Sequence, residues 1–265
     1  MSKVKLSIVI PTYNEDHNIG ECIRSVKWAD EIIVVDANST DKTRDICRRA
    51  GVTLIDFLGK NRFCEPQRWF GIQSASHNWI LCLDADERPS DLLKEEILNI
   101  LNFDISHEGF IIPFIHFIFG KRMKYGGLDD NYLLRLIRRD AAFYPMGGVV
   151  HEQLHVRGTI GQMKNPILHY GTRDFAQYFQ KMNLYTSLTA EKLFKQGVRI
   201  GYLNAPIYFV LKPVYYFLKR SIFQMGILDG PYGLALALLT AFTVIVNHLK
   251  LMELQYKEKQ LPNSY

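Results

Sequence analysis

Cysteine is scarce in this chain of 265 residues, and none of its four cysteines stands in a C-x-x-C pair. Cys22, Cys47, Cys64 and Cys82 therefore predict neither a zinc site nor a disulfide framework, and we expect buried free thiols in a reducing compartment. The N-terminal segment reaches Pro11 and polar residues too early for a secretory signal peptide. Internal repeats and low-complexity linkers are also absent from the sequence.

A strong charge of one sign is missing as well, since the formal net charge is only +5. The lysines and arginines do not form one basic stripe with interleaved aromatic residues, which argues against nucleic-acid binding. A mildly basic chain still suits an anionic ligand or a membrane surface. With 48% hydrophobic and 22% charged residues, the composition predicts one globular domain, or one domain with an appendage.

The first hundred residues alternate between strand-like and helix-like patterns. Short apolar runs predict strands, and segments with apolar residues at helical spacing predict helices between them. The expected strands are 6–10, 31–35, 52–55 and 79–83, and the expected helices are 18–28, from Ser39 or Thr40 to 51, 65–76 and 90–101. Such repeats predict an α/β fold with a mainly parallel sheet covered on both faces. Residues 110–119 and 131–138 look extended and predict added mixed or antiparallel strands.

The C-terminal region, from about Asp174, turns helical and increasingly apolar. Residues 230–249 contain no Asp, Glu, Lys or Arg, and that length suffices to cross a bilayer. Pro, Gly, Asn and His residues interrupt it, and basic residues flank it and the aromatic segment 202–218. This pattern is typical of helices that lie in the membrane interface. A buried helical pair that packs on the rest of the chain, and one true membrane span, are the alternatives.

Polar loops follow three of the predicted strands. They read Pro11-Thr12-Tyr13-Asn14-Glu15, then Asp36 to Asp41, then Asp84-Ala85-Asp86-Glu87. Because ligands of open α/β sheets bind beyond the carboxyl ends of the strands, we expect these loops to converge on one site. Crowded carboxylates repel one another unless a cation compensates them, and oxygen donors suit Mg²⁺ or Mn²⁺ shared with substrate phosphates. A D-x-D sequence in a simple turn or helix cap is the alternative.

Four segments together carry a resemblance to a known family. "LSIVIPTYNE", "IIVVDANSTDKT", "QRWFGIQSASHNWILCLDADE" and "GGVVHEQL" follow one another in order between about residues 4 and 155. In this the chain resembles the family-2 inverting glycosyltransferases of the GT-A fold, and among them the lipopolysaccharide core β-glucosyltransferases. The resemblance implies a GT-A catalytic domain over residues 1–173. From the apolar pattern, we expect the C-terminal helical region, 174–265, to attach to the cytoplasmic face of the membrane.

The resemblance also implies a nucleotide-sugar site. Pro11, Thr12 and Glu15 match the family's first nucleotide-binding loop, and Asp36 matches the acid that accepts a hydrogen bond from the base. Arg68 matches an arginine that faces the nucleotide, although Trp69 stands where the family usually has Asn. Of the D-x-D acids, Asp84 is expected near the ribose or sugar. Asp86 is the expected direct ligand of Mg²⁺ or Mn²⁺.

A base is needed to take the proton of the acceptor hydroxyl, and Glu152 is the expected base. The neighbouring His151 could be a third metal ligand, contact the leaving phosphate, or only orient Glu152. Asp129 and Asp130 are the reserve candidates for base or acceptor binding. The other histidines that lack metal-ligand spacing are expected to have ordinary structural roles: His107, His116, His155 and His169.

The expected function is transfer of a hexose, with UDP-glucose as the best single donor, to a lipopolysaccharide core or another lipid-linked glycan. A D-x-D phosphatase is disfavoured because Arg88 stands at the fifth motif position and the strand is not the first. A sugar nucleotidyltransferase would need a Gly-rich N-terminal loop with a basic residue. A non-catalytic, membrane-associated nucleotide-sugar-binding protein is the remaining alternative, yet it should have lost some of the acids Asp36, Asp84, Asp86 and Glu152, and all are present.

Overall fold

The computed structural model describes residues 4–59, 64–103, 106–128, 132–145 and 153–260. Its contacts divide the chain into two compact units. We call Met1–Ile115 with Asp130–Gly171 the sheet unit, and His116–Asp129 with Thr172–Tyr265 the helical unit. The predicted domain boundary between residues 173 and 174 stays a prediction.

A ten-stranded sheet holds most of the described strands, in the order β3-β2-β1-β4-β8-β6-β12-β5, with β7 and β11 pairing with β6. Parallel pairs join β1 to β2, β1 to β4 and β2 to β3, whereas β8 runs antiparallel to both β4 and β6. The bounds are β1 Leu6–Thr12, β2 Glu31–Asp36, β3 Thr53–Asp56, β4 Trp79–Cys82, β5 Glu87–Pro89, β6 Gly109–Ile118, β7 Lys121–Met123, β8 Tyr132–Arg138, β11 Ile160–Gln162 and β12 Ile167–Thr172. A separate antiparallel pair consists of β9 (Ala142–Phe143) and β10 (His155–Val156).

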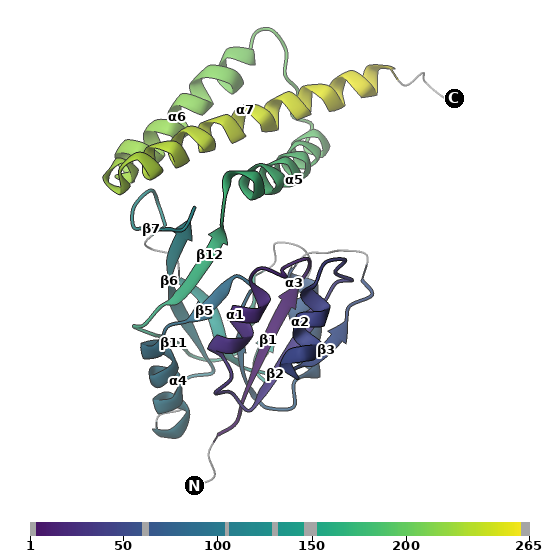
Figure 1. The fold of residues 1–265 in the computed structure, drawn as a ribbon. Coiled ribbons are helices and arrows are strands. Elements are labelled where there is room, and N and C mark those ends of the chain that lie inside the picture. The colour runs from purple at the N-terminus through teal and green to yellow at the C-terminus, as the bar shows by residue number, and fades with distance from the viewer. Residues whose placement is uncertain (1–3, 60–63, 104–105, 129–131, 146–152, 261–265) are drawn as a thin grey trace. The chain divides into compact units, whose positions relative to one another are not determined.

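Helices cover both faces of the parallel part of the sheet (Figure 1). Alternate residues of β1 face opposite sides of the sheet, each with its own hydrophobic core. On one side, Ile8 and Ile10 pack with α1 (Ile19–Ser25), α2 (Thr43–Ala50) and α4 (Asp91–Phe103). Val9 packs on the opposite face with Ile72 of α3 (Cys64–Ser74). This arrangement confirms the predicted fold class, a mixed and mainly parallel sheet flanked by helices.

Gly71 lets α3 approach the sheet closely. A Cβ atom at this position would lie 2.5 Å from Cγ1 of Val9 and 2.9 Å from Cγ2 of Val35. Both distances are shorter than a van der Waals contact, so any larger residue would push the helix away from β1 and β2. The close packing of α3 matters for the site because the same helix carries Arg68.

The element prediction was wrong at the start of α2, which begins at Thr43 rather than after a Ser39 or Thr40 cap. Ser39 instead hydrogen-bonds Asp36 through its hydroxyl, and the Thr40 N–H donates to the Asn14 side chain. These side chains connect two loops and do not cap the helix. The strands β5, β7 and β9–β12 were not predicted, because their residues form no continuous apolar run like those of β2 and β4. All four described cysteines are free thiols, as expected, and Cys22, Cys47 and Cys82 are buried. The expectation was wrong for Cys64, which is exposed at the start of α3.

The described residues of the helical unit form three α-helices, α5 (Phe175–Lys195), α6 (Lys212–Leu218) and α7 (Pro231–Gln260). Asp174 caps α5 by accepting a hydrogen bond from the Gln177 N–H at 2.8 Å. Helix α6 lies between two π-helical turns, η1 (Ile207–Leu211) and η2 (Lys219–Phe223), and the 3₁₀ turn η3 (Gly226–Asp229) precedes α7. Helix α7 packs against both α5 and α6.

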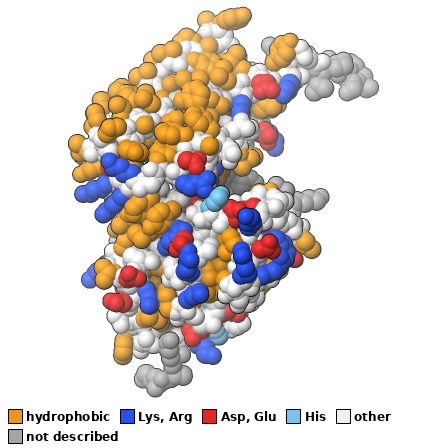
Figure 2. Space-filling view, in the orientation of Figure 1, with side chains coloured by type: hydrophobic (Ala, Val, Ile, Leu, Met, Phe, Trp, Pro, Cys, Tyr) orange, Lys and Arg blue, Asp and Glu red, His pale blue; other side chains and the backbone are white. Residues whose placement is uncertain are grey.

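Much of the apolar surface of the helical unit is exposed. Figure 2 shows hydrophobic side chains gathered over the C-terminal helices, and Tyr202 and Leu203 are 100% and 99% exposed. By length and composition alone, Pro231–Glu258 of α7 could cross a membrane. Contiguous exposed apolar surface marks a place where a partner or a membrane binds.

Candidate active site

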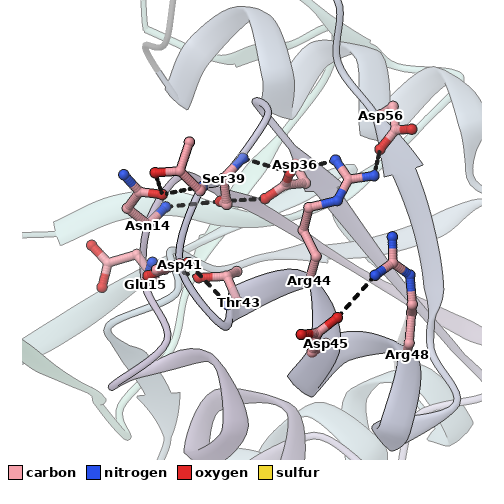
Figure 3. Close-up of polar contacts among 11 residues, drawn as sticks. Asn14, Glu15, Asp36, Ser39, Asp41, Thr43, Arg44, Asp45, Arg48 and Asp56 are labelled. Atoms are coloured by element: carbon pink, nitrogen blue, oxygen red, sulfur yellow. Dashed lines mark hydrogen bonds and ion pairs between the residues drawn. The ribbon is translucent and has the colours of Figure 1, made fainter.

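The loops that follow β1 and β2 are joined by a network of hydrogen bonds (Figure 3). The Asn14 N–H donates to the Ser39 hydroxyl at 2.8 Å, and the Thr40 N–H donates to Oδ1 of Asn14 at 2.7 Å. Asn14 has φ +53°, a left-handed conformation that Asn tolerates better than most residues. The two polar loops predicted from the sequence therefore form one connected surface at the carboxyl edge of the sheet.

Asp36 lies at the end of β2 and is completely buried. Its Oδ2 accepts hydrogen bonds from the Ser39 N–H at 2.9 Å and from Nη1 of Arg44 at 3.0 Å, and its Oδ1 accepts from the Ser39 hydroxyl. The other arm of the Arg44 guanidinium contacts Asp56 Oδ1 at 2.6 Å. Three donors thus hold the Asp36 carboxylate in one orientation, and a carboxylate so held can only accept further hydrogen bonds.

The residues predicted for the first nucleotide-binding loop lie beside Asp36. Pro11 and Thr12 are the register partners of Val35 and Asp36 in the β1–β2 pair. The Glu15 N–H donates to the Thr43 hydroxyl at 2.8 Å, and its carboxylate accepts from the Asn18 amide at 2.8 Å. The structure therefore brings these loop residues to the same sheet edge as Asp36.

Asp84 follows β4 and is held between two arginines. Its Oδ1 lies 2.5 Å from Nη2 of Arg68, and its Oδ2 lies 2.9 Å from Nη2 of Arg135. Burial by itself would raise the pKa of Asp84, but the two guanidinium groups outweigh burial and hold that pKa well below its usual range. Asp84 is therefore ionised and held in place, and the contact of Arg68 with the site is its ion pair with Asp84.

Arg135 and Glu87 complete a buried charge network that sequence analysis missed. Nη2 of Arg135 lies 2.6 Å from Glu87 Oε1, and Glu87 Oε2 accepts a hydrogen bond from the Asp84 N–H at 2.8 Å. With Arg68 and Asp84 the network contains two cations and two carboxylates, so the buried charges sum to zero. A signal for Arg135 did exist, because a charged residue in the apolar strand "YLLRLIR" needs a buried partner.

His169 lies beside Asp86, with Nε2 3.5 Å from Oδ2. Strand β12 places it there, because His169 is the register partner of Glu87 in the antiparallel pair with β5. The Tyr170 N–H also donates to the Asp86 carbonyl at 2.8 Å. Burial alone would lower the pKa of His169, but the hydrogen bond and charge of Asp86 outweigh it and raise the pKa. Sequence analysis expected only an ordinary structural role for this histidine.

Four predicted residues lie outside the described part of the chain: Asp129, Asp130, His151 and Glu152. Their roles stay predictions. Among the residues that the structure describes, no three His, Cys, Asp or Glu side chains converge in a way that could hold a metal ion. Asp86 and His169 are thus a pair of potential metal ligands.

The carboxylates of Asp36 and Asp84 follow β2 and β4, the two strands that flank β1, so they lie at one edge of a mixed α/β sheet. Residues 7–183 match Glycosyl transferase family 2, and the chain belongs to that family. It is 27% identical over 261 residues to the lipopolysaccharide core biosynthesis glycosyltransferase LpsC of Rhizobium meliloti, covering 93% of this chain and 94% of the relative. It is 26% identical over 276 residues to an uncharacterized glycosyltransferase of Rickettsia typhi, covering 97% and 90%.

Two solved structures show weaker likeness. The Staphylococcus aureus TarS fragment 1–349 in complex with UDP has a TM-score of 0.48 and 15% identity, over 98% of this chain and 93% of that one. Glucosyl-3-phosphoglycerate synthase of Mycobacterium tuberculosis, in complex with Mn²⁺, UDP and glucosyl-3-phosphoglycerate, has a TM-score of 0.46 and 15% identity, over 75% and 82%. The assignment rests on the family match: the chain is a family-2 glycosyltransferase, as its motifs predicted.

Proposed function

We propose that this enzyme transfers a hexose, with inversion, from a nucleotide-diphosphate sugar to a lipopolysaccharide core or another lipid-linked glycan. The observation that carries the proposal is the common sheet edge shared by Asp36, Asp84 and Asp86 in a family-2 chain. The likeness to LpsC over nearly the whole chain supports the acceptor class. UDP-glucose is the favoured donor, since the motifs resemble β-glucosyltransferases and the Asp36 carboxylate suits an imide N–H such as that of uracil.

The donor set fits a divalent cation. The Asp86 carboxylate and the His169 imidazole lie 3.5 Å apart, and both Asp84 oxygens are held by arginines. We therefore assign Mg²⁺ or Mn²⁺ to Asp86 and His169, with His151 as a further candidate ligand; an imidazole donor favours Mn²⁺. When bound, such an ion stabilises the charge of the departing diphosphate.

The chain's own residues divide the remaining work. Asp36 accepts a hydrogen bond from the base, and Arg68 fixes Asp84, which faces the ribose or sugar. Glu152 takes the proton of the acceptor hydroxyl as that oxygen bonds to the anomeric carbon, while the bond to the nucleoside diphosphate breaks. A positioned carboxylate contributes about 10²–10⁴-fold to such a step.

The helical unit supports attachment to the cytoplasmic face of the membrane. Its apolar residues are exposed over α6 and α7, and Lys250 and Lys257 follow the apolar segment of α7. Apolar faces with basic flanks bind the interface of anionic bilayers. Attachment would confine enzyme and lipid-linked acceptor to one surface.

The first test is thermal unfolding with UDP, GDP, CDP or ADP, each with and without Mn²⁺. A ligand at 100 times its dissociation constant adds about 2.7 kcal/mol of stability. We expect UDP to stabilise the protein only with Mn²⁺, and Asp86→Asn to remove the effect. If no nucleotide stabilises the protein with any metal, the acidic edge is not a donor site.

Transfer itself separates the enzyme from a non-catalytic nucleotide-sugar-binding protein. Glu152→Gln should leave the UDP-induced stabilisation nearly unchanged and abolish transfer to a confirmed acceptor. Wild-type turnover by Glu152→Gln would refute the base assignment. Asp129→Asn and Asp130→Asn then become the variants to measure.

A further inference from the structure

Helices α5, α6 and α7 and the turn η2 line an open cavity of about 520 Å³ in the helical unit. This volume lies in the range of small-molecule sites, about 300–1,000 Å³. Two cationic side chains, Lys212 and Arg220, line it together with the polar groups of Thr240, Asn247 and His248. The lining residues include no Asp or Glu. The lining is therefore mainly apolar, with two cationic side chains and a few polar groups set into it.

The charge of Arg220 lacks a carboxylate partner within the described ranges. Its Nη1 donates to the Thr240 hydroxyl at 3.1 Å, and Thr240 is neutral. Its Nε is buried and has no hydrogen-bond partner in that part of the chain. Burial lowers the pKa of Arg220, because burial disfavours the charged form. Arg220 is half-buried, and removing part of a guanidinium from water costs free energy unless an anion compensates its charge.

Lys212 adds a second positive charge to the same cavity. Its Nζ lies 4.3 Å from the centre of the Tyr208 ring, which in turn lies 4.7 Å from the His248 ring. No ion pair joins Lys212 to an acid in the described residues. A cation–π contact orients an ammonium group but leaves its charge uncompensated. Two such cations in one cavity suit a doubly charged anion.

We propose that this cavity binds the phosphate group of a phosphorylated lipid. The Arg fork matches phosphate geometry, and a lysine is the usual second phosphate ligand. The apolar part of the ligand follows from the surroundings. Tyr216 lines the cavity and is 40% exposed, and Leu211 of η1 and Phe242 of α7 expose further apolar surface. A soluble phosphate has no apolar part that could cover that surface, whereas a lipid has. The proposal concerns the helical unit by itself and does not rest on the proposed donor or acceptor.

The competing explanation is structural. Arg220 also packs near Gly126, where an added Cβ would lie 3.5 Å from the Arg220 Nε atom. In this explanation, the sole role of Arg220 is to hold the segment around Gly126 against the helices. Lys212 does not have this role, so a loss of binding in a Lys212 variant separates the two explanations.

The test measures binding of dihexanoyl phosphatidic acid, a soluble phosphorylated lipid, to the full chain by calorimetry. We expect saturable binding, weakened about tenfold or more by Lys212→Gln and by Arg220→Gln, as for loss of one charge-assisted hydrogen bond. Lys219→Gln is the matched control, because Lys219 is exposed, adjacent to Arg220 and outside the cavity lining. It should change the affinity less than about twofold. Circular dichroism establishes that each variant is folded.

Two further arms decide the ligand class. Inorganic phosphate should bind much more weakly than the lipid, and dihexanoyl phosphatidylcholine, whose phosphate is masked by a choline, should not compete. Equal affinity for inorganic phosphate would overturn the lipid assignment. Equal losses in Lys212→Gln and Lys219→Gln would show general surface attraction and overturn the site. If Arg220→Gln does not fold, Lys212→Gln alone decides.

Discussion

His169 of β12 and Asp86, in the turn before β5, lie 3.5 Å apart, Nε2 to Oδ2, although they are far apart in the sequence. Antiparallel pairing of β12 with β5 brings them together. The contact joins the D-x-D loop to a strand that directly precedes the helical unit. It gives the acidic edge an imidazole donor that no motif predicted.

A first prediction concerns this pair. His169→Ala should weaken the Mn²⁺-dependent stabilisation by UDP, because one of two protein donors is lost, with metal affinity falling by about tenfold or more. Stability without ligands should change little by comparison. His107→Ala is the control, since that ring contacts Phe110 and lies outside the acidic cluster. Unchanged metal dependence in His169→Ala would exclude the residue as a ligand.

A second prediction concerns the buried network. Arg135→Met should destabilise the protein by about 3–5 kcal/mol, because it leaves the carboxylates of Asp84 and Glu87 undercompensated. Adding Glu87→Gln should recover part of the loss, since it restores charge balance with Arg68. Urea unfolding gives both values. Arg138 lies on the same strand as Arg135 and forms an exposed ion pair with Asp140. Arg138→Met should cost about 1 kcal/mol or less.

A third prediction concerns Asp36, the acid that we propose accepts a hydrogen bond from the nucleotide base. Asp36→Asn should weaken UDP binding by about tenfold or more, because the amide loses a charged acceptor worth roughly 1.5–3 kcal/mol. Asp56→Asn is matched to it, since Asp56 pairs with the same Arg44 guanidinium but is 53% exposed. Calorimetric titration with UDP and Mn²⁺ measures both. Equal losses in the two variants would mean that Arg44 pairing, and not acceptance from the base, explains the effect.

A fourth prediction concerns acid stability and Glu31. Its carboxylate accepts hydrogen bonds from the Ser7 hydroxyl and from the N–H and hydroxyl of Ser76. Burial by itself would raise the pKa of Glu31, but these hydrogen bonds outweigh burial and lower it below its ordinary value of 4.5. The folded state therefore binds fewer protons, so this stabilisation is present above pH 4.5 and disappears as pH falls through the folded pKa.

Glu31→Gln should accordingly reduce the free energy of unfolding by about 1 kcal/mol near neutral pH. The difference from wild type should shrink as the pH falls below the ordinary carboxyl value. Urea unfolding across a pH series measures it. A difference that stays constant with pH would contradict the assigned cause.

The parallel core and its acidic edge could be predicted because local patterns encode them. The apolar runs of β1, β2 and β4 can only be buried strands, and the loop after each strand must lie at its carboxyl end. Asp36, Asp84 and Asp86 therefore follow from strand position. The charge partners of these acids do not, since Arg135 and His169 reach them through pairings of β8 and β12 that no local period specifies.

The sequence by itself determined the family, the parallel core and the position of the carboxylates, because each depends on neighbours along the chain. The tertiary structure decided which acid is held by arginines and which faces a histidine, and that Lys212 and Arg220 share one cavity. These relations depend on strand register and helix packing between distant segments. Burial then sets their strength, because the same charges would interact far more weakly in water.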